Sequence, residues 1–317
     1  MNINEIYPLW IENKVNYVKK SSISTYKMNY KNNIGVFIGD KKPEEITNQF
    51  MNEFVLKLAQ TGLGNKTIKD SCIVVKMILD FYYEQKELPP VRFKIRFPQD
   101  NNTEKKIDVY SDFEQKKIVN FLLENHNPKN LAIALTLCTG IRIGELCALK
   151  WSDIDLEEKV INIEKTIQRI YTPDEENNKN KFGKKMSTQI IFQTPKTNGS
   201  RRSVPIANFL IKTLKLYKRI MKDEYYFNTG TKDFCEPRTF RSYYNKTMRE
   251  IGIDKPIKFH GLRHSFATRM ISQGTDLKTT SMILGHSKVE MTMNLYVHPT
   301  EQSKNDAINK SMAKLFK

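Results

Sequence analysis

The sequence predicts a mainly α-helical protein with a small antiparallel β-sheet, built as an N-terminal helical domain and a C-terminal α+β domain. Apolar residues recur at helical spacing over most of the chain, whereas strand-like segments are confined to residues 159–206. A polar, proline-containing stretch follows residue 88 and separates two regular regions. A chain of 317 residues also exceeds what one hydrophobic core usually supports.

The N-terminal domain is expected to span residues 1–98 and to be helical. Residues 99–106 are interpreted as the linker, because the sequence around Pro98 resists regular structure. The second domain then covers residues 107–317. The apolar positions that predict the N-terminal helices are Phe50, Phe54 and Leu58, followed by Ile73, Met77, Ile78 and Phe81.

The second domain opens with a capping box, in which Ser111 and Glu114 satisfy free backbone donors at a helix start. The apolar run 131–137 predicts a core helix that ends at Thr139-Gly140. Arg142 is therefore expected at the start of the next helical segment. Trp151, which follows, is interpreted as a packing anchor rather than a base-stacking platform.

Strand patterns occupy residues 160–163, 189–192 and 202–206. Asn198-Gly199 is a strong turn signal, so the last two strands are expected to form a hairpin that presents Lys196. The intervening loop, 171–187, is long and polar, and such loops are functional or disordered. Helical patterns return at 209–217 and 238–252 and continue to the end.

The net charge of +17 favours a polyanionic partner, with nucleic acid ahead of an anionic membrane surface. Residues 105–317 carry 37 Lys and Arg against 23 Asp and Glu, so the excess lies mostly in the second domain. A basic surface that serves solubility alone is the alternative. Four cysteines without a C-x-x-C pair, no signal peptide and no membrane span predict a cytoplasmic protein.

Five residues in the second domain are together suited to phosphodiester chemistry: Arg142, His260, Arg263, His286 and Tyr296. Guanidinium groups stay charged and match two phosphate oxygens, so the two arginines can clamp one phosphate and stabilise the charge that develops during displacement. No metal or other cofactor is required for this chemistry. The histidines suit donation to the phosphate or proton shuttling.

Tyr296 is the candidate nucleophile, because nearby guanidiniums favour the phenolate. Its phosphate ester is reversible without ATP. Lys196 or a histidine is the candidate proton donor to the leaving oxygen. Other readings remain: a packing tyrosine, a surface ion pair between Arg142 and Glu145, or a metal pair of His260 with His264, although the glutamate of H-E-x-x-H is absent. His264 and His298 are taken as structural.

At these residues the chain resembles the tyrosine recombinases, the phage-integrase family of site-specific DNA recombinases. The resemblance covers nearly the whole chain. It implies that Arg142, His260, Arg263 and His286 activate the phosphate, that Lys196 is the general acid and that Tyr296 is the nucleophile. The segments that carry it are Thr139-Gly140-Ile141-Arg142-Ile143-Gly144-Glu145-Leu146, Thr194-Pro195-Lys196-Thr197, His260-Gly261-Leu262-Arg263, Leu284-Gly285-His286-Ser287 and Tyr296.

The resemblance also implies an N-terminal SAM-like core-binding domain and a catalytic domain that close as a C-shaped clamp around duplex DNA. It implies a homotetramer on two recombination sites, strand exchange through a Holliday junction, and accessory DNA-bending or excision proteins. The C-terminal helix would be exchanged between protomers. The apolar stripe that fits this role consists of Ala307, Ile308, Met312, Leu315 and Phe316.

The ten-residue interval from His286 to Tyr296 and the loop at 171–187 resemble phage and mobile-element integrases. The chain begins too close to its first expected helix for an added arm-binding domain, so a Xer-like dimer resolvase stays open. A type IB topoisomerase uses nearly the same residues. A DNA-binding protein without catalysis is the rival from another class.

Overall fold

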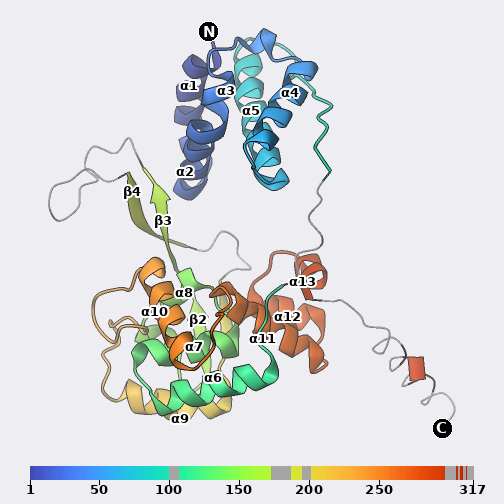
Figure 1. The fold of residues 1–317 in the computed structure, drawn as a ribbon. Helices are drawn as coiled ribbons and strands as arrows, with labels where there is room; N and C mark the ends of the chain where they lie inside the picture. The colour runs from blue at the N-terminus through green and yellow to red at the C-terminus, as the bar shows by residue number, and fades with distance from the viewer. Residues whose placement is uncertain are drawn as a thin grey trace. The chain divides into compact units, whose positions relative to one another are not determined.

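The computed structural model describes residues 1–99, 107–172, 187–194 and 201–296, together with residues 305, 308, 309 and 312 (Figure 1). The chain divides into two compact units, one formed by Met1–Lys105 with Arg169–Ile191 and the other by Lys106–Gln168 with Phe192–Lys317. Helices dominate and the sheets are small, which confirms the predicted fold class. Within the described ranges, every helix is too short or too polar to cross a membrane.

The first unit is a helical bundle with its own core. Trp10, Phe54 and Ile78 are almost fully buried in it. Ile73, one of the apolar positions that predicted these helices, lies on α5 with its side chain 55% exposed, whereas the neighbouring Cys72 is buried in the core. The helices are α1 (Ile3–Val15), α2 (Lys20–Asn29), α3 (Gly35–Ile38), α4 (Asn48–Gln60) and α5 (Asn65–Gln85), with a π-helical turn at Tyr30–Ile34.

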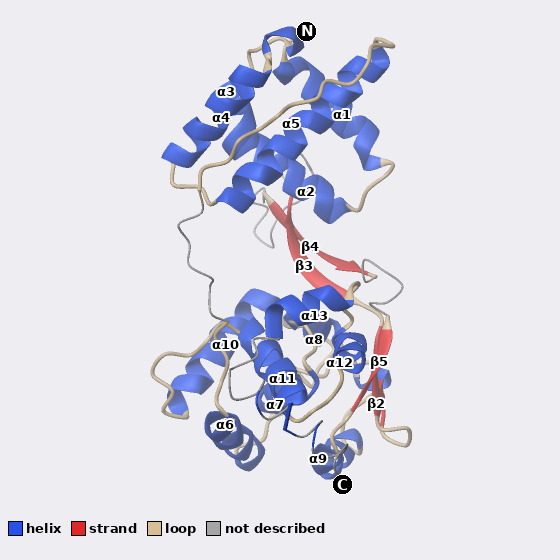
Figure 2. Cartoon of the chain, turned by 90° about the vertical axis from the view of Figure 1, so that its right-hand side faces the viewer, coloured by secondary structure: helices blue, strands red, loops and turns tan. Residues whose placement is uncertain are grey.

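The second unit is built around α7, which is apolar on all sides and almost entirely buried. It contacts α6 on one side and α11 on another, and α11 also contacts α12 and α13 (Figure 2). The predicted capping box of Ser111 and Glu114 is present at the start of α6. The helices are α6 (Asp112–Glu124), α7 (Pro128–Thr139), α8 (Ile143–Ala148), α9 (Asn208–Lys218), α10 (Pro237–Glu250), α11 (His260–Ser272), α12 (Leu277–Leu284) and α13 (Val289–Tyr296).

The strands form two small sheets. β1 (Ile154–Asp155), β2 (Val160–Ile163) and β5 (Arg202–Pro205) make an antiparallel sheet in the order β1-β2-β5. β3 (Thr166–Tyr171) pairs with β4 (Thr188–Gln193) in a second sheet.

The three predicted strands exist, but the prediction that β4 and β5 form a hairpin is wrong, because they lie in different sheets. Buried Val204 of β5 pairs instead with Ile161 of β2, so both side chains enter the core. β4 pairs with β3, a strand that the sequence pattern did not predict. The Asn198-Gly199 turn lies outside the described residues.

Trp151 lies three residues after the end of α8 and is fully buried. Its ring is stacked with that of Tyr217, with centroids 6.1 Å apart, and lies 4.9 Å from that of Phe227. This confirms the prediction that Trp151 is a packing anchor. It fixes the chain a few residues after α8.

Candidate active site

The turn between α7 and α8 depends on Gly140, whose φ of 66° lies in the left-handed region. A Cβ atom at this position would lie 2.7 Å from side-chain atoms of both Leu284 and Phe266, so only glycine fits. The Gly140 carbonyl accepts a hydrogen bond from Nη1 of Arg263 at 2.7 Å. As predicted, the turn places Arg142 at the start of α8, as its N-cap residue.

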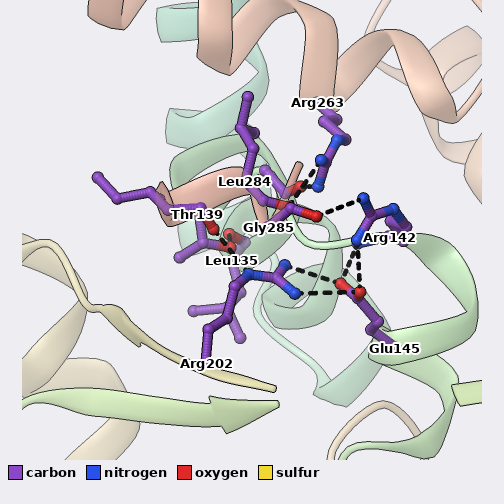
Figure 3. Close-up of polar contacts among 10 residues, drawn as sticks. Leu135, Thr139, Arg142, Glu145, Arg202, Arg263, Leu284 and Gly285 are labelled. Atoms are coloured by element: carbon purple, nitrogen blue, oxygen red, sulfur yellow. Dashed lines mark hydrogen bonds and ion pairs between the residues drawn. The ribbon is translucent and has the colours of Figure 1, made fainter. Parts of the chain in front are cut away.

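Arg142 is held by two different groups (Figure 3). Its Nη1 donates to Oε1 of Glu145 at 2.8 Å, its backbone N–H donates to Oε2 at 2.9 Å, and its Nη2 donates to the Gly285 carbonyl at 3.0 Å. The Arg142 side chain is 35% exposed, whereas that of Glu145 is 4% exposed. The contact is therefore not an ordinary surface ion pair, because its carboxylate is buried.

A second arginine, Arg202 at the start of β5, shares this carboxylate. Its Nη1 and Nη2 atoms donate to Oε1 and Oε2 of Glu145 at 3.1 and 2.9 Å. Burial raises the pKa of Glu145, but the hydrogen bonds and charge of Arg202 and the charge of Arg142 outweigh it, so the pKa lies below its ordinary value. The carboxylate is thus ionised. Sequence reasoning did not identify Arg202.

Arg263 lies on α11 and is 1% exposed. In addition to its bond to Gly140, its Nη2 donates to the Leu284 carbonyl at 2.7 Å. Helix α11 is packed against α7, α12 and α13, which buries this side chain from several directions. The guanidinium is therefore fixed by backbone groups of two other segments.

The C-terminal end of α12 brings these arginines together. Gly285 ends the helix in the left-handed conformation, with φ 64°, and a Cβ atom there would lie 3.0 Å from Cδ and Nη1 of Arg202. The last carbonyls of a helix lack partners within it and carry partial negative charge. Here the carbonyls of Leu284 and Gly285 accept from Arg263 and Arg142.

His286 follows this helix end, and its Nδ1 lies 2.8 Å from Oγ1 of buried Thr292 on α13. Burial and the positive charges of Arg263 and Arg142 lower the pKa of His286 to about 4. At neutral pH its imidazole is therefore uncharged.

His260 begins α11, and its ring centroid is 4.7 Å from that of His264. Although His260 reaches solvent, partial burial of its ring, His264 and the charge of Arg263 lower its pKa to about 4. This imidazole is also neutral at neutral pH. The neighbouring His264 has a lowered pKa as well, through burial and the charge of Arg263.

The structure brings four of the six predicted site residues together: Arg142, His260, Arg263 and His286. The positive charges of both arginines lower the pKa of both histidines, so the four side chains lie close to one another. Tyr296 is the last residue of α13, one helical turn after Thr292, but its side chain lies outside what the structure describes. Lys196 lies in a segment that is not described.

Sequence comparison connects this arrangement with known proteins. Residues 110–303 match the phage integrase family, and residues 2–59 match the phage integrase N-terminal SAM-like domain. The chain is 32% identical over 272 residues to a XerC-like tyrosine recombinase of Caldanaerobacter subterraneus, covering 80% of this chain and 67% of that protein. It is 26% identical over 271 residues to the ICEBs1 integrase of Bacillus subtilis, with the same coverage of both proteins. The chain spans about two thirds of the length of these relatives.

Comparison of structures gives the same fold. A Tn1549 transposon integrase in complex with circular intermediate DNA superposes with a TM-score of 0.74 at 20% identity, covering 98% of this chain and 99% of that one. A lambda integrase tetramer bound to a Holliday junction gives a TM-score of 0.63 at 17% identity, covering 94% and 78%. The chain therefore belongs to the phage integrase family and is a site-specific tyrosine recombinase.

Proposed function

We propose that this recombinase cleaves and rejoins duplex DNA through a covalent 3′-phosphotyrosine at Tyr296, with neither a metal nor ATP. One observation carries the proposal: the guanidiniums of Arg142 and Arg263 bind successive carbonyls, those of Gly285 and Leu284, directly before His286. Two fixed positive charges beside two imidazoles match the needs of a phosphodiester whose non-bridging oxygens gain charge during displacement.

The two arginines take different parts in holding the phosphate. Arg142 is 35% exposed and is the guanidinium that contacts the non-bridging oxygens. Arg263 is buried and adds a second positive charge from within the protein. A scissile phosphate bound here replaces solvent beside Arg142, and both charges then stabilise the pentacoordinate transition state.

Tyr296 acts as the nucleophile. Thr292, one helical turn earlier on α13, is hydrogen-bonded to His286, so α13 is tied to the phosphate site close to position 296. The Tyr296 oxygen attacks phosphorus, a P–O bond forms, and the bond to the 5′ oxygen breaks. The phenol proton passes to a neutral imidazole of His260 or His286. A 5′ hydroxyl from the partner strand later reverses the step, since the ester retains the bond energy.

Lys196 is the general acid that donates a proton to the leaving 5′ oxygen. The described residues on either side of its segment, Thr194 and Arg201, adjoin strands β4 and β5. The Lys196→Ala variant is expected to cleave ordinary DNA slowly, by a factor of ~10²–10⁴. Replacing the leaving oxygen with sulfur, which departs without a proton, should restore most of the rate. Equal slowing on both substrates would remove Lys196 from this role.

The proposed partners are duplex recombination sites and three further copies of the chain. Residues 1–98 bind DNA as the core-binding domain, 99–106 are the linker and 107–317 catalyse strand transfer. Ile308 and Met312, the members of the C-terminal stripe that the structure describes, are 60% and 45% exposed, so they present apolar side chains that a neighbouring protomer can cover. Accessory DNA-bending proteins would then act on the assembled complex.

A mobile-element integrase is the favoured subgroup. The ten-residue interval from His286 to Tyr296 and the structural likeness of the chain to a transposon integrase both agree with it. A dimer resolvase is the second candidate, favoured by the 32% identity to a XerC-like recombinase. Recombination between two plasmids would support the integrase. Strict preference for two sites on one plasmid would support the resolvase, and relaxation of plasmid without any site would indicate a topoisomerase.

The central test is capture of the covalent intermediate. A duplex selected by binding from a random-sequence pool is nicked near the scissile phosphate, so that the cleaved strand diffuses away, and the reaction is run in EDTA. Denaturing electrophoresis should show a protein–DNA adduct with the wild-type chain and none with Tyr296→Phe. An adduct that survives in Tyr296→Phe would place the nucleophile elsewhere.

A further inference from the structure

Three arginines, not two, bind the end of α12. Nε of Arg202 donates to the carbonyl of Ile283 at 2.7 Å. The next two carbonyls, those of Leu284 and Gly285, accept from Arg263 and Arg142 (Figure 3). Three consecutive carbonyls therefore hold three guanidiniums. Arg202 is the member of this set that has no part in the proposed chemistry.

The position of Arg202 excludes direct contact with DNA in this arrangement. Its side chain is 7% exposed, and its two terminal nitrogens form a fork on the Glu145 carboxylate. Oε1 of Glu145 also accepts from Arg142, so one buried carboxylate serves two guanidiniums. Arg202 is thus linked to Arg142 through Glu145.

The charges decide what this link does. Glu145 is buried and ionised, and a buried carboxylate needs a cationic partner. With Arg202 present, the carboxylate is already neutralised, and Arg142 keeps a net positive charge for a phosphate. Without Arg202, Arg142 would be the only one of the two arginines left to pair with Glu145. The carboxylate would then cancel the positive charge that the phosphate requires.

We propose that Arg202 is a positioning residue, the dedicated counterion of Glu145, which keeps the Arg142 guanidinium charged and turned toward the scissile phosphate. The inference rests on the proposed function, because it assigns Arg142 to the phosphate. It predicts a defect in the chemical step rather than in DNA binding. It also predicts that removing the Glu145 charge compensates for removing the Arg202 charge.

The test compares single-turnover cleavage at saturating DNA with the dissociation constant for DNA. Arg202→Met should cleave on the order of 10- to 100-fold more slowly, a smaller loss than removal of a group that contacts the reacting phosphate. Its DNA affinity should change less than about threefold. Exposed Arg201 is the matched control, and Arg201→Met should retain the wild-type cleavage rate.

Two further readouts separate positioning from a purely structural role. Arg202→Lys keeps a cation beside Glu145 and should cleave faster than Arg202→Met, and the double variant Arg202→Met/Glu145→Gln should recover much of the lost rate. A methylphosphonate at the scissile position is uncharged and needs less positive charge. On that substrate the defect of Arg202→Met should shrink to less than about threefold.

Several results would overturn the inference. One is cleavage by Arg202→Met at the wild-type rate, and another is an equal defect on the charged and neutral phosphates. If Arg202→Met does not fold, the cleavage rates of Arg202→Lys and of the double variant test the proposal instead. A double variant that cleaves as slowly as Tyr296→Phe would count against it. Absence of any adduct with the wild-type chain would instead reject the proposed function itself.

Discussion

Replacing Glu145 with glutamine should destabilise the second unit by about 3 kcal/mol. The carboxylate accepts four hydrogen bonds, two from Arg142 and two from Arg202, at 2.8–3.1 Å. The amide of glutamine has one acceptor oxygen, and its NH₂ group would face guanidinium donors. At least two charge-assisted bonds are lost, each worth ~1.5 kcal/mol or more. The total agrees with the ~3–5 kcal/mol cost of breaking a buried ion pair.

Urea unfolding at neutral and acid pH measures this loss. Trp151 lies in the second unit, so its fluorescence in a Trp10→Phe background reports that unit alone. The pKa of Glu145 lies below its ordinary value in the folded chain. The carboxylate therefore stabilises the fold above the ordinary pKa, and this contribution disappears as the pH falls through the folded pKa. The difference between Glu145→Gln and wild type should close at acid pH.

The control for this prediction is Glu158→Gln, at an exposed position on the same unit, which should change the stability by less than about 0.5 kcal/mol. A loss below about 1 kcal/mol in Glu145→Gln would refute the reasoning. So would a difference that stays constant between neutral and acid pH, because the carboxylate charge would then not be the source.

Two other predictions concern the histidines. Thr292→Val removes the hydroxyl that contacts His286, so single-turnover cleavage should slow about tenfold. The DNA affinity, measured by a binding titration, should stay the same. An unchanged cleavage rate would show that the contact between His286 and α13 does not matter for the reaction. NMR titration of the DNA-free chain should give a pKa of about 4 for His260 and for His286. Because these values lie below the unfolded value of about 6.5, their stabilising contribution should be complete above pH ~6.5 and lost as the pH falls toward 4. A measured pKa near 6.5 for either histidine would contradict the prediction that burial and the neighbouring arginine charges lower the pKa.

The arginines and histidines of the site were predictable because each lies in a short segment with its own pattern. Gly140 predicted the turn that places Arg142, and the structure confirms both. Glu145 stands three residues after Arg142, the usual position for a side chain that caps a helix start. That spacing alone could have indicated its contact with the Arg142 backbone.

No short sequence pattern of this kind identifies Arg202. Its contact with Glu145 joins residues 57 positions apart, and neither helical nor strand periodicity encodes such a distance. The pairing of β5 with β2 brings it there, whereas the Asn-Gly turn favoured a hairpin with β4. Local turn chemistry was outweighed by the burial of Val204 against Ile161.

The end of α12 also determines which changes the site can tolerate. Its three contacts with arginines use carbonyl oxygens, which every residue possesses, so these bonds do not depend on the identity of the side chains at Ile283 and Leu284. The number of residues in the helix cannot vary in the same way. One inserted residue would rotate the end by about 100° and turn all three acceptors from their partners together. These three contacts thus constrain the length of the helix, whereas the burial of Leu284 and the left-handed conformation of Gly285 constrain its sequence.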